Sequence, residues 1–129
     1  MIFSVVIYSA PYTSESAANA LRFSQAAVDK GHQIYRLFFF SDGVHNANKL
    51  AITPQDEQNL QATWDSFIRS NKLDSVVCVS SALKRGIIGA DEARNHDLDS
   101  QSLQPSSNIS GLGQFVDAYI KSDRVISFG

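Results

Sequence analysis

Short apolar runs alternate with longer amphipathic stretches along this chain. Residues 2–8, 33–40, 74–79 and 123–128 form four runs that are rich in β-branched and aromatic side chains, and each run predicts a β-strand. The first run, IFSVVIY, is almost continuously apolar, which is typical of a strand that is buried on both faces. The pattern therefore favours a sheet that is covered on both sides.

Three amphipathic stretches separate these runs and predict helices. The first begins near the capping groups of residues 14–16 and stops at Gly31. The second is expected to begin at Thr53-Pro54, an N-cap followed by a first-turn proline, and the third spans residues 112–121. Residues 91–107 are polar, contain a proline and predict an irregular loop.

Strands that alternate with helices predict an α/β fold with a mainly parallel sheet, right-handed crossovers and helices on both faces. No linker or repeat interrupts residues 1–129, and this length suits one core, so we expect a single domain. In such folds the reactive groups lie beyond the carboxyl ends of the strands. Residues 9–13, 42–48 and 78–85 are expected at that edge.

Charge and composition narrow the classes of function. The chain has 11 Lys and Arg against 13 Asp and Glu, and Lys84-Arg85 is its only adjacent basic pair. Proteins that hold a nucleic-acid backbone present clustered basic side chains, so we expect no direct binding of DNA or RNA. The N-terminal apolar run is too short for a signal peptide or a membrane span, so we expect a cytoplasmic protein that does not contact a membrane.

Cys78 is the only cysteine, and it lies in the stretch DSVVCVSSALKRG near the end of the third expected strand. Ser80 or Ser81 can cap a short helical turn after it, and Lys84 and Arg85 follow. A helix N-terminus and nearby cations favour the thiolate, which is the nucleophilic form of cysteine. Periodicity alone equally supports a buried strand cysteine without chemistry. The position at the working edge favours the functional interpretation.

The segment FFFSDGVHNANK, residues 38–49, is expected to form a wall beside Cys78, because a glycine turn lets the backbone approach a neighbour closely. His45 is its one side chain that can carry a proton near neutral pH, and Asn46 follows it. A lone loop histidine is more often a solvated surface residue. Phe39 or Phe40 in the same segment is expected to stay exposed and to form part of an oligomer interface.

Cofactor motifs are weak in this sequence. No spacing of His, Cys or carboxylate residues matches a metal site. The segment SAPYTSES is rich in Ser and Thr, as in a flavodoxin-like phosphate loop, but it lacks the glycines that bring the backbone close to a phosphate. The segment ISGLGQF lacks the third glycine of the dinucleotide fingerprint. We therefore expect no cofactor and no metal.

Four segments in order, FFFSDGVHNANKL, VCVSSALKRG, ISGLG and SDRVISF, resemble the DsrE-type sulfur-relay family, and most closely its TusD branch. The resemblance runs through essentially the whole chain. It implies a three-layer α/β/α fold with a sheet of about five strands. It also implies sulfurtransferase activity, with sulfane sulfur carried as a persulfide on Cys78. For His45, Asn46, Ser80, Lys84 and Arg85 it implies only a neighbourhood of the site.

The resemblance further implies partners. Chains of this branch assemble with TusB- and TusC-like subunits in a heterohexamer, accept sulfur from a TusA-like donor and pass it to a TusE-like acceptor, toward 2-thiouridine at the wobble position of tRNA. Two alternatives stay open from the residues themselves. One is a flavodoxin-like nucleotide-binding module, and the other is a structural subunit of a relay complex whose cysteine is inert.

Overall fold

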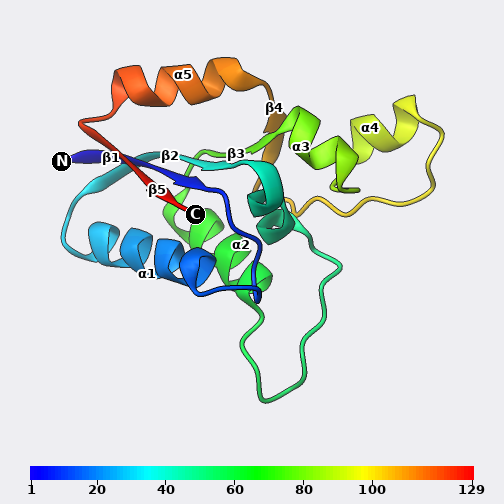
Figure 1. Ribbon diagram of the computed structural model, residues 1–129, viewed down its shortest axis with the longest axis horizontal. Coiled ribbons are helices and arrows are strands. Elements are labelled where there is room, and N and C mark those ends of the chain that lie inside the picture. The colour runs from blue at the N-terminus through cyan, green and yellow to red at the C-terminus, as the bar shows by residue number, and fades with distance from the viewer.

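Five parallel strands form one sheet in the computed structural model, which describes residues 1–129 (Figure 1). The strands are β1 (Ile2–Ile7), β2 (Gln33–Phe39), β3 (Ser75–Cys78), β4 (Asn108–Ser110) and β5 (Arg124–Phe128). Their order across the sheet is β4-β3-β2-β1-β5, and every neighbouring pair is parallel. The carboxyl ends of all five strands therefore lie at one edge.

Helices cover both faces of this sheet. They are α1 (Ser16–Asp29), the 3-10 helix η1 (Ser41–Ala47), α2 (Leu60–Asn71), α3 (Val79–Lys84), α4 (Ala90–Asn95) and α5 (Leu112–Lys121). In Figure 1 α1 and α2 lie on one side of the sheet, α5 lies on the other, and α3 and α4 extend from the side of β4. The three-layer α/β/α fold with a parallel sheet of five strands is thus confirmed. None of the helices is both long and apolar enough to cross a membrane.

The larger core lies between the sheet and the helices α1 and α2. Alternate strand residues such as Ile7, Leu37 and Val77 point into it and are buried. Trp64 of α2 is 0% exposed and packs edge-on against Phe39, with 5.3 Å between the ring centroids. Because most of the buried apolar side chains gather here, this face carries most of the hydrophobic stabilisation.

The smaller core lies between the sheet and α5. Its buried members are Val6, Phe38, Val76 and Cys78, which alternate along their strands with the residues of the larger core. Phe115 of α5 packs against this cluster together with half-buried aromatic side chains from the ends of β1 and β2. Cys78 is therefore directed toward the α5 face of the sheet.

Several element boundaries differ from the sequence expectation, and most of the strand ends that differ do so by a single residue. Helix α2 begins at Leu60 and not at Thr53-Pro54, because Asn59 is its N-cap and its side chain accepts a hydrogen bond from the N–H of Ala62. The third strand ends at Cys78 and not at residue 79, because Val79 already begins α3.

The segment 91–107, expected to be an irregular loop because it is polar, begins within a helix and leads into a strand. Helix α4 begins at Ala90, and the carboxylate of Glu92 accepts a hydrogen bond from the N–H of Gly89. Strand β4 follows at residues 108–110 and is too short to produce a visible alternation.

The expected exposure of Phe39 or Phe40 is wrong. Phe39 is fully buried in the larger core, and Phe40 is half-buried beside Phe38. Eleven large apolar side chains remain exposed, and four of them share the outer face of α5, where Ile120 is 73% exposed. The others on this face, which we call the outer α5 face, are Leu112, Val116 and Tyr119.

One buried arginine fastens α5 to the sheet. Arg36 of β2 donates from Nε to Asp74 at 2.7 Å, and from one terminal nitrogen to the carbonyl of Gln114 at 2.8 Å and to Asp117 at 3.1 Å. The hydroxyl of Tyr35 also donates to the carboxylate of Asp117. Hydrogen bonding to Tyr35 and to Arg36 lowers the pKa of Asp117 below its ordinary value. Two side chains of β2 thus fix the inner side of α5.

This network predicts acid-sensitive stability. A carboxyl whose pKa is lowered in the folded state stabilises the fold above its unfolded pKa of about 4, and this contribution is lost as the pH falls through the folded value. We expect Asp117→Asn to reduce the free energy of unfolding at neutral pH and to flatten its decline below pH of about 4. Chemical denaturation at several pH values measures this.

The matched control is Asp56→Asn, since Asp56 is exposed and makes no ion pair. If the free energy of unfolding of Asp117→Asn falls with pH in parallel with that of the wild type, the carboxylate contributes nothing to the pH dependence of stability. Arg36→Met should be the more severe change and destabilise the fold by roughly 2–3 kcal/mol, because it leaves two carboxylates without their cation.

Candidate functional site

Cys78 lies where two helices begin at the carboxyl edge of the sheet. It is the last residue of β3 and the N-cap of α3. Its register partner on β4 is Ser110, and α5 begins shortly after that residue, at Leu112. The N-terminus of a helix carries partial positive charge, so both helices favour a negative charge at this edge. The sequence predicted the start of both helices but placed only the first of them beside Cys78.

The thiol of Cys78 is not open to solvent. The residue is 1% exposed and belongs to the smaller core, together with Val6, Phe38 and Val76. The rings of Tyr8 and Phe115 lie against the same cluster. An attacking sulfur can reach the thiol only if part of this cover moves.

Two opposing influences act on the pKa of the Cys78 thiol. Burial raises the pKa, whereas the N–H and hydroxyl groups of Ser81 and Ser80 lower it. The hydroxyl of Ser80 lies 3.6 Å from the sulfur. The sulfur does not complete a capping hydrogen bond, but these donors outweigh burial, and the pKa falls below its usual value. No cation is among the main groups that shift the pKa of this thiol.

The helix η1, expected as a wall beside Cys78, packs against α3, the helix that follows Cys78. A Cβ at Gly43 would lie 1.9 Å from the carbonyl oxygen of Ile7, so only glycine lets η1 approach the end of β1 this closely. The N–H of Ser41 donates to the hydroxyl of Ser81 at 3.0 Å. Asp42 accepts from Nε of Arg85 at 2.8 Å. Backbone and side chains therefore join η1 to the helix that follows Cys78.

His45 and Asn46 lie on η1 and do not hydrogen-bond the thiol. Asn46 is fully buried, and its Nδ2 donates to the carbonyls of Ser9 and Gly43 at 3.0 and 2.9 Å. This residue therefore ties the loop after β1 to η1. The ring of His45 makes no hydrogen bond within the chain, while its carbonyl accepts from Gln61.

Lys84 and Arg85 lie at the far end of α3. Arg85 is held by Asp42 and by the carbonyl of Ser81, and Lys84 is exposed and makes no ion pair. Among the predicted neighbours, only Ser80 contacts the sulfur.

The sequence interpretation missed two groups that shape the site, Ser81 and Phe115. The sequence indicates Ser81 only as a possible cap, although its N–H and hydroxyl lower the pKa of the thiol. Phe115 reaches the cluster from a distant part of the sequence, and only the apolar pattern of its helix indicated an inward position. No three His, Cys, Asp or Glu side chains converge in a way that would hold a metal ion.

Sequence comparisons match this chain over its whole length. The family described as DsrE/DsrF-like has a sequence model that matches residues 1–128. A protein named sulfurtransferase TusD homolog from Pseudomonas aeruginosa is 42% identical over 129 residues, which cover 100% of this chain and 98% of that protein. DsrE from Allochromatium vinosum, named as a candidate sulfurtransferase, is 40% identical, with 100% and 99% covered.

A solved structure has the same fold. The crystal structure of the YchN protein from E. coli matches with a TM-score of 0.77 and covers 99% of this chain and 100% of that one. The two sequences are 23% identical, so this likeness concerns the fold alone.

The contacts of the sulfur predict which residues control its ionisation. We expect Ser80→Ala to raise the pKa of the Cys78 thiol, because a donor to the thiolate is removed. The thiolate absorbance in the ultraviolet, titrated against pH, measures this directly in a chain with one cysteine.

The matched control is Lys84→Gln, which removes the nearest unpaired cation in the sequence and should leave the titration unchanged. The reverse result, a shift with Lys84→Gln and none with Ser80→Ala, would mean that charge and not hydrogen bonding sets the pKa.

Proposed function

Because this chain belongs to the DsrE/DsrF-like family, as its sequence resemblance predicted, we propose that it carries sulfane sulfur as a persulfide on Cys78 and passes it to an acceptor protein. It is a sulfurtransferase of the sulfur-relay type. The observation that carries the finer proposal is the placement of its one thiol, which belongs to the N-cap residue of α3 and has a lowered pKa. Residues 1–129 act as one DsrE-like domain.

The chemistry is two successive exchanges at sulfur. The Cys78 thiolate attacks the terminal sulfur of a donor persulfide, a new S–S bond forms on Cys78, and the donor leaves as a thiolate. An acceptor thiolate then attacks the outer sulfur of the Cys78 persulfide, and the Cys78 thiolate leaves. Each exchange makes one S–S bond and breaks another. No net oxidation occurs, so no redox cofactor is needed.

The environment of the thiol suits both exchanges. The donors of Ser80 and Ser81 favour the anion that attacks and later departs. A single cysteine cannot close an internal disulfide and expel its own sulfur cargo. Cover by Tyr8 and Phe115 separates the thiol from solvent between transfers.

The proposed destination of the sulfur is the wobble uridine of tRNA. The TusD name of the Pseudomonas relative favours this pathway, while the similarity to DsrE points to sulfur oxidation as the second candidate. In the proposed pathway a TusA-like protein supplies the sulfur and a TusE-like protein receives it. The chain itself makes no nucleic-acid contact.

Of the two alternatives to a sulfur-transfer role, a structural subunit and a nucleotide-binding module, only the first has structural support. Near-complete burial of Cys78 favours a structural subunit with an inert thiol, and the first experiment below separates that role from transfer. The flavodoxin-like nucleotide module is set aside, because the family match runs over residues 1–128.

Assembly with TusB- and TusC-like subunits is the second part of the proposal. The outer α5 face exposes four large apolar side chains on one helix, and contiguous apolar surface of this kind is typical of a protein interface. This face replaces Phe39 and Phe40 as the expected interface. A partner on α5 would also lie directly over the cover of Cys78.

Cys78→Ser is expected to abolish sulfur transfer and to preserve the fold. A serine hydroxyl has no appreciable anionic fraction at neutral pH and cannot hold a sulfane sulfur. The cost in stability should be about 1–2 kcal/mol, because the hydroxyl is buried but has N–H groups of α3 nearby. Intact mass after incubation with a cysteine desulfurase and cysteine measures the gain of one sulfur atom, and addition of acceptor measures its loss.

The assay is run on the chain alone and on its complex with TusB- and TusC-like subunits. Transfer at the wild-type rate by the Cys78→Ser complex would show that the thiol is inert. Ser75→Ala is the fold control, since Ser75 is buried on the same strand but faces away from α5.

Charge on the outer α5 face should prevent assembly. We expect Ile120→Glu to weaken binding to the TusB- and TusC-like subunits by at least about tenfold, because a carboxylate in an apolar interface is desolvated without a partner. Leu98→Glu is the control, since Leu98 is an exposed apolar residue outside α5. Light scattering of the co-purified complex reports its mass. An intact complex with Ile120→Glu would place the interface elsewhere.

A further inference from the structure

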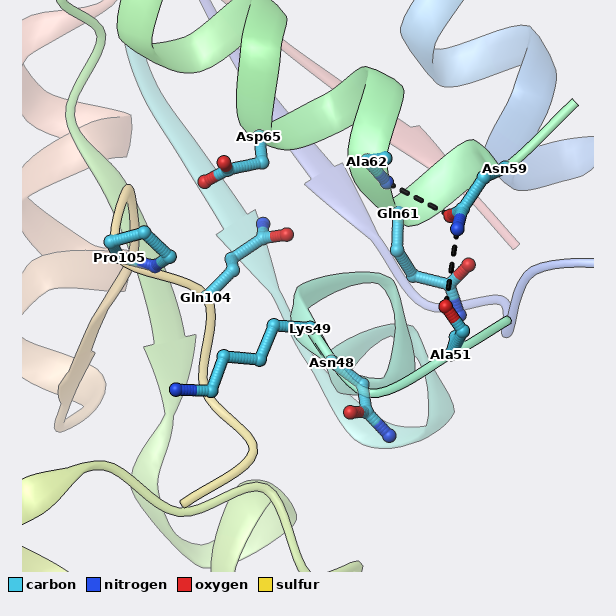
Figure 2. A pocket seen from close by; sticks show the side chains of 9 residues that line it. All are labelled: Asn48, Lys49, Ala51, Asn59, Gln61, Ala62, Asp65, Gln104 and Pro105. Carbon is cyan, nitrogen blue, oxygen red and sulfur yellow. Dashed lines mark hydrogen bonds between the residues drawn. The ribbon is translucent and has the colours of Figure 1, made fainter. Parts of the chain in front are cut away.

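A cavity of about 170 Å³, lined mostly by polar residues, lies away from the thiol, and Cys78 does not line it. It is enclosed by the segment after η1, the first turns of α2 and the segment before β4 (Figure 2). Pockets for drug-sized ligands span roughly 300–1,000 Å³, so an occupant of this cavity must be small. The sulfur exchange described above does not use this cavity.

Hydrogen bonds hold the walls of the cavity in place. The amide of Asn59 caps α2 and also donates from Nδ2 to the carbonyl of Ala51 at 3.1 Å. The backbone of Gln104 donates to the carbonyl of Ala47 at 2.8 Å, and the N–H of Lys49 donates to the carbonyl of Ser102 at 2.7 Å. The cavity is therefore preformed and does not depend on a ligand for its shape.

Two buried glutamines line this cavity and differ in what they leave free. Gln61 is 6% exposed, its Oε1 accepts from the hydroxyl of Tyr12, and its Nε2 donates to the carbonyl of His45. Gln104 is 2% exposed, and its Nε2 makes one long hydrogen bond of 3.4 Å to Ser107. Its Oε1 accepts no hydrogen bond within the chain. Figure 2 shows the Gln104 amide directed into the cavity, so this oxygen can accept a hydrogen bond from an external donor.

Opposite charges lie on either side of this amide. Figure 2 shows the carboxylate of Asp65 on one side of Gln104 and the side chain of Lys49 on the other. Asp65 keeps its place through the N–H of Ser106 at 3.2 Å and through Arg69 at 2.9 Å. Lys49 makes no ion pair, and its ammonium group is free to bind an anion. A ligand that contacts all three groups must carry an anion for Lys49 and an N–H donor for Oε1 of Gln104 and for the remaining lone pairs of Asp65.

We propose that this cavity binds a small free α-amino acid as its zwitterion. The carboxylate pairs with Lys49, and the α-ammonium donates to Oε1 of Gln104 and to Asp65. The cavity volume limits the side chain to a short one. Charge-assisted hydrogen bonds of this kind are stronger than neutral ones, so a few contacts are enough for measurable affinity.

The test is an NMR titration of the full chain with L-alanine. We expect saturable shifts of the backbone amides at residues 48–51 and 104–106. Acetate lacks the ammonium and L-alaninamide lacks the carboxylate, so each should bind at least about tenfold more weakly than L-alanine. Equal binding of acetate would overturn the zwitterion assignment, and the absence of saturable shifts with L-alanine would overturn the site.

Variants locate the two charges. Lys49→Met and Asp65→Asn should each weaken L-alanine binding by at least about tenfold, whereas Lys84→Met, at an exposed and unpaired lysine elsewhere, should not. Asp65→Asn is nearly isosteric and can still accept the Ser106 N–H, and Lys49 is exposed, so neither change threatens the fold. Undiminished binding by Lys49→Met and Asp65→Asn would contradict the proposal. None of these measurements depends on sulfur transfer.

Discussion

The attachment of α5 to the sheet through Arg36 is the interaction on which the arrangement around Cys78 depends. The inward side of α5 offers only Phe115 and Ala118 to the sheet, whereas its outward side is largely apolar. Apolar packing alone therefore gives this helix little preference between its two sides. The guanidinium of Arg36 supplies the preference, because its donors meet two carboxylates and a backbone carbonyl and thereby offset its desolvation. The cover of the thiol is consequently fixed by a polar network on the neighbouring strand.

The same arrangement reconciles two requirements that normally conflict. An attacking thiolate needs nearby donors, and a stored persulfide needs separation from competing thiols. The N–H groups of α3 come from the residues that directly follow Cys78, while the cover comes from elements far away in sequence. Because the two influences arise from different parts of the chain, the cover can change without loss of the donors.

The sequence predicted the fold well, because strands buried on both faces leave a strong apolar pattern. It also placed Cys78 at the correct edge, since parallel strands share that edge. The sequence prediction was wrong about the start of α2, because Asn59 caps this helix and the apparent start signal at Thr53-Pro54 is not used. The partners of Arg36 and the cover by Phe115 were invisible, because such contacts join residues distant in sequence. Arg85 appeared to serve the thiol because no pattern reveals its pairing with Asp42.

The burial of Trp64 on the face opposite Cys78 gives the molecule a selective optical probe. It is the only tryptophan, and it reports on the larger core, where it packs against Phe39. When the whole domain unfolds, the indole becomes exposed to water, and its fluorescence should shift to longer wavelengths. Ionisation of the thiol or displacement of α5 takes place on the other side of the sheet and should leave the emission spectrum unchanged. Emission and thiol reactivity together can therefore distinguish an opened site from an unfolded protein within a single sample.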